Sequence, residues 1–311
     1  MKDNLVTQSN DLVSASYIMS VSEKELLLAC ISKIDSRPNR PEQVTKQTKF
    51  TISIDTMKEL FYKDTNRDNA YRDLKKSADR LFDREVTIKL DNNKTLRTRF
   101  VSGIVFDPDQ AQITVTFAED ILPYLTELSV NFTKYRLHEV AELSSVHAIR
   151  LYELIIMWTN QYQYSKELDL NEFKEIMGVQ NKYKQFGQLR ERVIETAINE
   201  INEKTNYKVN VSYKKVRRSY VSLTVKFHKK ILDKIANKDG TLSEDTIKSI
   251  VNNLQFMKDY NDHSSLSYQG KTETEAFKRE MFQIIQKEPE SFNKKNKGLA
   301  SYLAPIKQGS Y

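Results

Sequence analysis

The sequence has little of what marks secreted, membrane-bound or disulfide-stabilised proteins. It contains one cysteine, Cys30, among 311 residues, so no internal disulfide can form. Cys30 lies on an apolar helical pattern, which predicts a buried thiol rather than a nucleophile. No apolar run approaches the roughly 18 residues that span a bilayer. The polar first ten residues lack the apolar centre of a secretory signal. We therefore expect a cytoplasmic protein without a membrane partner.

The residue patterns of common catalytic sites are also missing. The four histidines are scattered, and none has zinc-site spacing with another histidine or with Cys30. A rolling-circle nickase would need a closely spaced histidine pair beside its tyrosine nucleophile. The segment Gly270-Lys271-Thr272 resembles the end of a phosphate loop, but Ser265 stands where the first glycine is needed. We expect no metal, no cofactor and no enzymatic activity.

Positive charge is present and is concentrated in one segment. The net charge of the chain is +7. Residues 181–230 hold thirteen lysines and arginines against four glutamates, a local net charge of +9, so the rest of the chain carries −2. A localised excess of this kind is typical of a surface that binds nucleic-acid phosphates.

Two parts of the chain repeat one order of elements, a short capped helix, a longer helix, and then strands. The first part has helices at 55–61, capped by Asp55, and at 68–82, followed by strands at 85–90, 96–106 and 112–117. The second has a helix capped by Asp169 and ended by Gly178, a long helix at 186–203, and strands at 207–213 and 220–227 joined by a basic turn at 214–219. Further helices are expected at 22–34 (capped by Ser22), 119–125, 135–143 and from Ser144 or Ser145 to about residue 162. The last of these is apolar nearly all round, which predicts a buried helix.

This order predicts an α+β protein built from two tandem winged-helix domains, in which the later helix enters the major groove and the hairpin touches the backbone. We expect the first domain at residues 1–130, the second at 131–230 and a tail at 231–311 that is helical or partly disordered. In the tail, a capping box at 241–244 predicts a helix to about residue 259, and another is expected at 272–286.

The period of the long helix in the second repeat separates a packed face from a reading face. The packed face is shared by Leu189, Val193, Ala197 and Ile201. The residues that point away from it are Gln188, Arg192, Glu195 and Asn199, whereas Arg190 falls nearer the packed side but has a side chain long enough to reach out. The expected DNA-binding residues of this repeat are Lys182, Lys184 and Gln185 before the helix, Gln188, Arg190 and Arg192 on it, and Lys214, Lys215, Arg217 and Arg218 at the hairpin. In the first repeat Leu74, Ala78 and Leu81 pack, and the expected DNA contacts are Asn69, Arg72, Lys76 and Arg80. The same surface carries Asp73, Asp79 and Asp83, which predicts weaker DNA binding by the first repeat.

Several of these segments resemble one known family. The stretch Phe132–Tyr135, the run from Ser144 through Arg150-Leu-Tyr-Glu-Leu154, and Asn199-Glu-Ile-Asn202 followed by a basic turn and a strand ending at Phe227 are similar to the theta-type plasmid replication initiator (Rep) proteins, which bind iterons. The resemblance covers about residues 5–230. The reading helix of this family is richer in arginine, and Glu191 interrupts the basic run here.

The resemblance implies a bacterial initiator that binds repeated origin DNA as a monomer and represses its own expression as a homodimer through the first domain. It also implies host replication initiator and helicase-loading proteins as partners. Two alternatives stay open, a winged-helix transcriptional repressor and a replication enzyme such as a nickase or primase.

Overall fold

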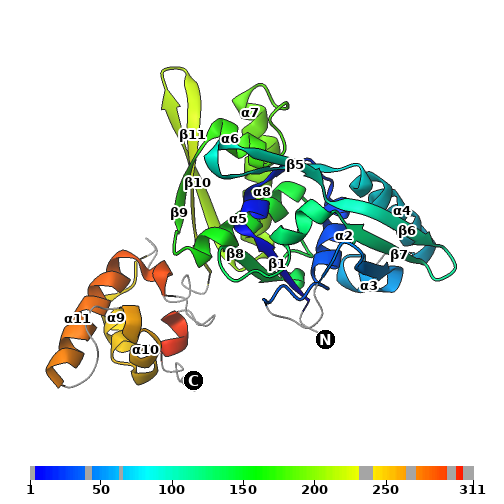
Figure 1. Cartoon of the computed structure of the whole chain (residues 1–311). Helices are drawn as coiled ribbons and strands as arrows, with labels where there is room; N and C mark the ends of the chain where they lie inside the picture. Colours follow the sequence, from blue (N-terminus) through cyan, green and yellow to red (C-terminus); the bar gives the residue numbers. More distant parts are fainter. Residues whose placement is uncertain are drawn as a thin grey trace, which may run out of the picture. The chain divides into compact units, whose positions relative to one another are not determined.

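The computed structural model describes residues 4–38, 44–62, 66–230, 241–263, 271–292 and 299–303. The described residues fall into two compact units. One spans Met1–Gln161, Lys166–Thr205 and Asn210–Val225, and the other spans Tyr162–Ser165, Asn206–Val209 and Lys226–Tyr311. Each unit is taken by itself below (Figure 1).

The first winged helix combines a helical layer with two antiparallel sheets. Its helices are α2 (Val21–Ile31), α3 (Ile54–Leu60) and α4 (Arg67–Phe82). One sheet has the order β2-β4-β5, from Ser16–Tyr17, Glu85–Lys89 and Thr95–Arg99, and the other has the order β3-β7-β6, from Lys49–Ser53, Gln112–Phe117 and Val101–Asp107. Helix α4 packs on α2, α3 and β6, with Leu74, Ala78 and Leu81 buried as expected.

Several predicted boundaries in this part were wrong for local reasons. Ser20, not Ser22, caps α2, because its hydroxyl accepts from the Glu23 amide while Glu23 reaches back to the Ser20 amide. Ser53, not Asp55, caps α3 in the same way. The single strand expected at 96–106 is two strands, β5 and β6, because the chain passes from one sheet to the other at the buried Phe100.

The N-terminal segment forms elements that no pattern predicted. Strand β1 (Leu5–Ser9) pairs antiparallel with β8 (Phe132–Arg136), and α1 (Asn10–Ser14) follows β1. The helix expected at 135–143 was therefore wrong, because β8 occupies its start and only a 3₁₀ turn, Leu137–Glu139, follows. The alternation of buried Thr133 and Tyr135 with exposed Lys134 is the strand signal that was missed. A further 3₁₀ helix, Glu119–Tyr124, stands where a helix was expected at 119–125.

Helix α5 (Val146–Asn160) is the central buried helix of the first unit. It packs against α1, β8 and the later helix α8 (Thr196–Lys204). The carboxylate of Glu153 is buried on it and accepts hydrogen bonds from Gln8 and Tyr135, both at 2.7 Å, and an ion pair from Lys24 at 2.9 Å. The expectation of a buried helix beginning near Ser145 is confirmed.

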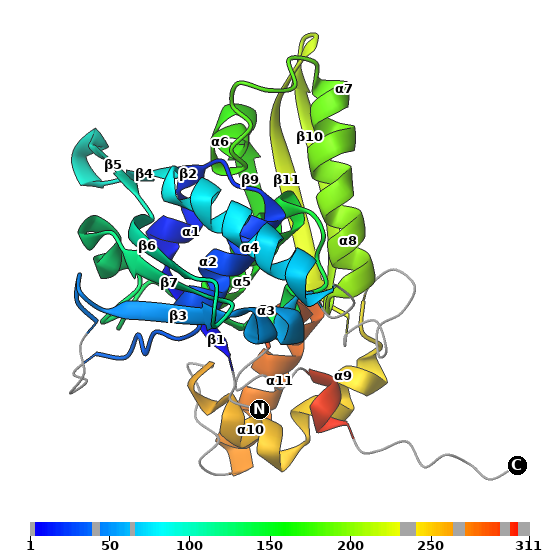
Figure 2. The same cartoon turned by 90° about the vertical axis from the view of Figure 1, so that its right-hand side faces the viewer.

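The second winged helix follows the predicted order. It comprises β9 (Ser165–Asp169), α6 (Leu170–Ile176), a helix running from Phe186 to Lys204, and the hairpin of β10 (Tyr207–Val216) and β11 (Ser219–Lys229), with sheet order β10-β11-β9. Asp169 caps α6 by accepting from the amides of Asn171 and Glu172, and Gly178 adopts a left-handed φ of 67° just after it, both as expected. The outer end of the hairpin lies beside α7, the start of the long helix (Figures 1 and 2).

The described part of the tail forms a small helical unit with its own core. Its helices are α9 (Glu244–Val251), α10 (Leu254–Asp259) and α11 (Lys271–Lys287), followed by 3₁₀ turns at Pro289–Ser291 and Leu299–Tyr302. Ile247, Phe256, Tyr260, Phe277 and Met281 are fully buried in that core. The expected capping residue was wrong, because Ser243 rather than Thr241 accepts from the Thr246 amide. The chain also breaks at Asn253, which caps α10.

Candidate nucleic-acid interface

The helix from Phe186 to Lys204 contains a π-helical turn at Arg190–Glu195 between α7 (Phe186–Leu189) and α8 (Thr196–Lys204). The wider turn places Val193 and Ile194 together in the core beside the other buried residues, Leu189, Ala197 and Ile201. A regular α-helical period places Ile194 at the edge of that face, so sequence periodicity did not single it out. π-helical turns inside helices occur frequently at functional sites.

The opposite face of this helix is exposed and carries the expected reading residues. Gln188, Arg190 and Arg192 are exposed, and so are Glu191 and Glu195. The Arg190 Nε atom lies 3.2 Å from the Glu195 Oε1 atom, five residues on, and the Thr196 hydroxyl donates to the Glu191 carbonyl at 3.0 Å. Both contacts close the wide turn. Arg190 is thus partly neutralised, whereas Arg192 forms no ion pair with the residues that the structure describes.

The start of the helix suits a phosphate group. Lys182, Lys184 and Gln185 are exposed immediately before Phe186. Gln185 occupies the capping position but makes no side-chain capping bond. The first amides of the helix and its positive dipole end therefore stay available to an anion.

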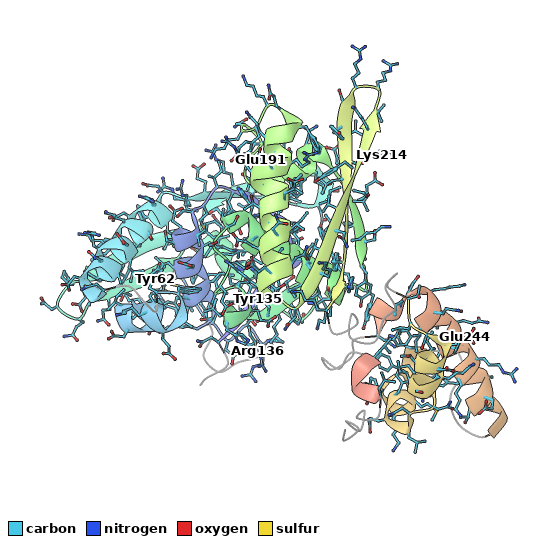
Figure 3. All side chains as sticks on the ribbon, turned by 180° about the vertical axis from the view of Figure 1, so that it is seen from behind. Tyr62, Tyr135, Arg136, Glu191, Lys214 and Glu244 are labelled. Carbon is cyan, nitrogen blue, oxygen red and sulfur yellow. The ribbon has the colours of Figure 1, made fainter. Side chains whose placement is uncertain are left out.

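The hairpin β10–β11 forms the wing. Arg217 and Arg218 lie in its tight turn, and Arg217 has a left-handed φ of 54°. Lys214 and Lys215 were expected in the turn but belong to β10, because both strands run further than the apolar pattern indicated. All four side chains are exposed, and Lys214 lies near the outer end of the hairpin (Figure 3). Lys214 Nζ approaches Glu167 at 3.7 Å, and Lys215 Nζ lies 5.2 Å from the centre of the Tyr220 ring.

Three aromatic rings join the wing to the helix. Phe186, the first residue of α7, stacks on Tyr220 of β11 with ring centres 3.9 Å apart. The Tyr213 ring of β10 meets Phe186 edge-on at 5.1 Å. Aromatic contacts of this kind hold a defined geometry. They hold the start of the helix against the wing. The basic residues before the helix and those on the wing are therefore held at a defined spacing. Sequence reasoning missed this cluster, because its members are far apart in the chain.

The equivalent face of the first winged helix is less basic. Asn69, Arg72, Lys76 and Arg80 are all exposed on α4, as expected. The Asp73 carboxylate, however, lies 3.5 Å from Arg72 and 3.9 Å from Lys76. One carboxylate therefore neutralises part of the charge of two of the four expected DNA contacts.

The two winged helices meet closely between β2 and the end of α6. The Ser16 hydroxyl donates to the Glu175 carbonyl at 2.8 Å. A Cβ atom on Gly178 would lie 2.2 Å from the Tyr17 carbonyl oxygen, so only glycine fits this approach.

Two negative findings apply to the residues that the structure describes. Within them, His, Cys, Asp and Glu form no group of three or more that could hold a metal ion. None of their helices combines the length and the apolar character that crossing a membrane requires.

Together, two winged helices in series, with an exposed basic helix and wing on the second, define a tandem winged-helix protein. Residues 5–156 match the family model described as "Initiator Replication protein, WH1", and residues 169–227 match the model described as "Initiator Rep protein, WH2". The two matches cover more than half of the chain, and the chain belongs to this family of replication initiator proteins. The resemblance inferred from the sequence is confirmed.

Individual relatives agree with the family assignment. The chain is 26% identical over 215 residues to a replication initiation protein of Escherichia coli, an alignment that spans 68% of this chain and 66% of that relative. Its fold is similar to that of the Pi initiator protein, solved in complex with iteron DNA. The two structures superpose with a TM-score of 0.60 and are 21% identical in sequence. The match covers 73% of this chain and 98% of the Pi initiator chain.

Proposed function

We propose that this protein binds repeated origin DNA through its second winged helix and thereby initiates replication. The observation that carries this proposal is the exposed basic face formed by the start of α7, Arg192 and the wing of β10–β11. Its parts match what a winged helix needs, namely a helix for the major groove and a hairpin for the backbone. The family membership and the iteron complex of a similarly folded initiator support the proposal.

The proposed residues divide by role. Gln188, Arg190 and Arg192 contact base edges, for which glutamine and arginine offer paired hydrogen bonds to adenine and guanine. Lys182, Lys184 and Gln185 bind phosphate at the helix start. Lys214, Lys215, Arg217 and Arg218 contact the backbone. Asn69, Arg72, Lys76 and Arg80 supply a secondary contact from the first domain.

We assign residues 1–130 to dimerisation and secondary DNA contact, residues 131–230 to DNA reading and residues 231–311 to a tail. In this proposal the monomer binds iterons, and the homodimer, formed through the first domain, represses the protein's own gene. Host replication initiator and helicase-loading proteins are the proposed partners, on the basis of family membership. The protein acts by binding and not as an enzyme.

A binding experiment on the DNA that flanks the gene tests the proposal. Fluorescence anisotropy should be measured with a duplex carrying its direct repeats and with a shuffled duplex of the same length, at physiological salt. We expect the repeats to bind at least about a thousandfold more tightly, the lower end for specific sites. Equal affinity for the two duplexes would overturn the proposal. A lone inverted repeat as the preferred target would favour the repressor alternative.

A further inference from the structure

A small cavity lies where the two winged helices meet. It has a volume of about 170 Å³. Its walls come from the end of β2 and the residues after it, the start of α5 and the segment after α6. The polar side chains of its lining are those of Tyr17, His147, Arg150, Lys182 and Tyr183. At roughly 30 Å³ per water molecule, this space holds about five or six water molecules. A tetrahedral oxyanion has about as many non-hydrogen atoms and therefore fits.

Arg150 is the unusual member of this lining. Its side chain is only 2% exposed, and its guanidinium lies 3.6 Å from the centre of the Tyr17 ring. One nitrogen, Nη2, donates to the Ala15 carbonyl at 2.6 Å, but Nε and Nη1 have no partner among the described residues. A buried cation with unpaired donors is costly unless an anion completes it.

Lys182 adds a second positive charge to the lining of the cavity. Neither aspartate nor glutamate is among the lining residues. The buried Nδ1 of His147 has no partner in the described chain. Burial and, to a smaller extent, the positive charges of Arg150 and Lys182 lower the pKa of His147 to about 4, so the imidazole is neutral at neutral pH.

We propose that this cavity is a binding site for a small phosphate dianion, held by Arg150, His147 and Lys182. Because Arg150 is enclosed, the ligand is a free phosphate or the phosphate end of a mononucleotide rather than the backbone of a duplex. The bound anion bridges the first winged helix to the second and stabilises their junction. The cavity shares Lys182 with the proposed DNA contacts, whereas Arg150 and His147 belong to the cavity alone. Phosphate binding is measured without DNA, so its failure is distinguishable from a failure of the proposed DNA binding.

Thermal unfolding of the full chain tests the site. Inorganic phosphate and AMP are added in parallel at about 20 mM against sodium chloride of equal ionic strength, which controls for general screening. We expect phosphate to raise the unfolding midpoint by about 2–4 °C above the chloride control. An equal or larger rise with AMP identifies a mononucleotide as the source, whereas a rise with phosphate alone identifies the free ion. No rise with either ligand overturns the proposal.

Matched variants assign the effect to the cavity. Lys182→Gln removes an exposed lysine of the lining. Lys204→Gln removes an exposed lysine at the end of α8 that neither lines the cavity nor belongs to the proposed DNA contacts. We expect Lys182→Gln to abolish at least half of the phosphate shift and Lys204→Gln to keep it. Phosphorus NMR of the folded proteins gives a second measurement, in which the phosphate line broadens with wild type and less with Lys182→Gln. Equal effects of the two substitutions contradict the assignment.

Discussion

At the scale of single residues, Arg192 is the best candidate for direct base reading. It is exposed on the helix that enters the groove in winged helices, near the helix start. We expect Arg192→Ala to cost about 1–3 kcal/mol of binding free energy and to relax the preference at one base position. Anisotropy titrations against a set of single-base variants of the repeat measure both effects. A uniform loss on every duplex would assign Arg192 to the phosphates instead.

Lys215 offers the contrasting case, because it lies on the wing, which we propose contacts the DNA backbone rather than base edges. We expect Lys215→Ala to weaken binding to all duplexes alike and to flatten the dependence of log K on log salt by about one unit. Titrations at four salt concentrations measure the slope. An unchanged slope with a changed base preference would contradict this role.

Glu191 is the residue that least fits a DNA-binding face. Its exposed carboxylate lies between Arg190 and Arg192, and its repulsion from phosphate opposes binding to any duplex. In the major groove a glutamate can accept only from a base amino group, as on cytosine. We therefore expect Glu191→Gln to raise the affinity for unrelated DNA severalfold. The affinity for the repeat divided by the affinity for unrelated duplex should then fall. Competition titrations measure that ratio, and an increased ratio would contradict the argument.

At the scale of elements, helix α2 carries a pH-sensitive group. Glu25 is 9% exposed, and its burial raises the pKa of the carboxyl to about 7, although a hydrogen bond from Tyr62 acts in the opposite direction. Tyr62 follows α3 (Figure 3). Because the folded state holds this proton more tightly than the unfolded chain, its contribution to stability is full below pH 4.5 and is lost as the pH rises to about 7.

Denaturant unfolding at several pH values checks this element. The stability of the wild type relative to Glu25→Gln should fall by up to about 3 kcal/mol between pH 4.5 and 7. The lowered pKa of His147 makes its own contribution to stability rise with pH. Because the variant retains His147, taking the difference between wild type and variant cancels that contribution. A constant difference across this window would mean that Glu25 is ionised in the folded protein.

The elements also show how far sequence reasoning reaches. The order of helix, helix and hairpin was predictable in both halves, because periodicity and capping residues such as Asp169 are local signals. The exposed positions of Gln188 and Arg192 followed from the same period, whereas Arg190 is exposed although that period places it nearer the packed face. What could not be predicted depends on distant partners. Strand β8 exists because β1 pairs with it, and the rings that hold the wing come from three separate elements.

Gly178 lies where the segment after α6 approaches β2 most closely. Gly178→Ala would place a Cβ atom 2.2 Å from the Tyr17 carbonyl and would strain a left-handed φ. We expect a loss of at least about 2 kcal/mol of unfolding free energy, since backbone must move on both sides. Gly187→Ala is the matched control, because a Cβ atom there meets nothing within 4 Å. A similar loss in the control would indicate that general helix effects, not the junction, are responsible.

At the scale of the whole molecule, the two winged helices share a design but differ in charge. Asp73 partly neutralises Arg72 and Lys76 on the first, whereas Arg192 and Lys215 of the second have no carboxylate within ion-pair distance among the described residues. Such an asymmetry fits the proposal that the second domain anchors the protein on DNA while the face of the first is available for a second subunit.

A pair of double variants tests this division of labour. One variant carries Arg192→Gln and Lys215→Gln on the second winged helix. The other carries Arg72→Gln and Lys76→Gln on the first. Each variant removes two exposed positive charges, so the two have the same net charge. We expect the first pair to reduce affinity for the repeat at least tenfold more than the second, because the charges it removes are not already compensated. Circular dichroism confirms that both variants fold. An equal or larger loss from the pair on the first winged helix would make that domain the anchor and reverse the proposed order of contacts.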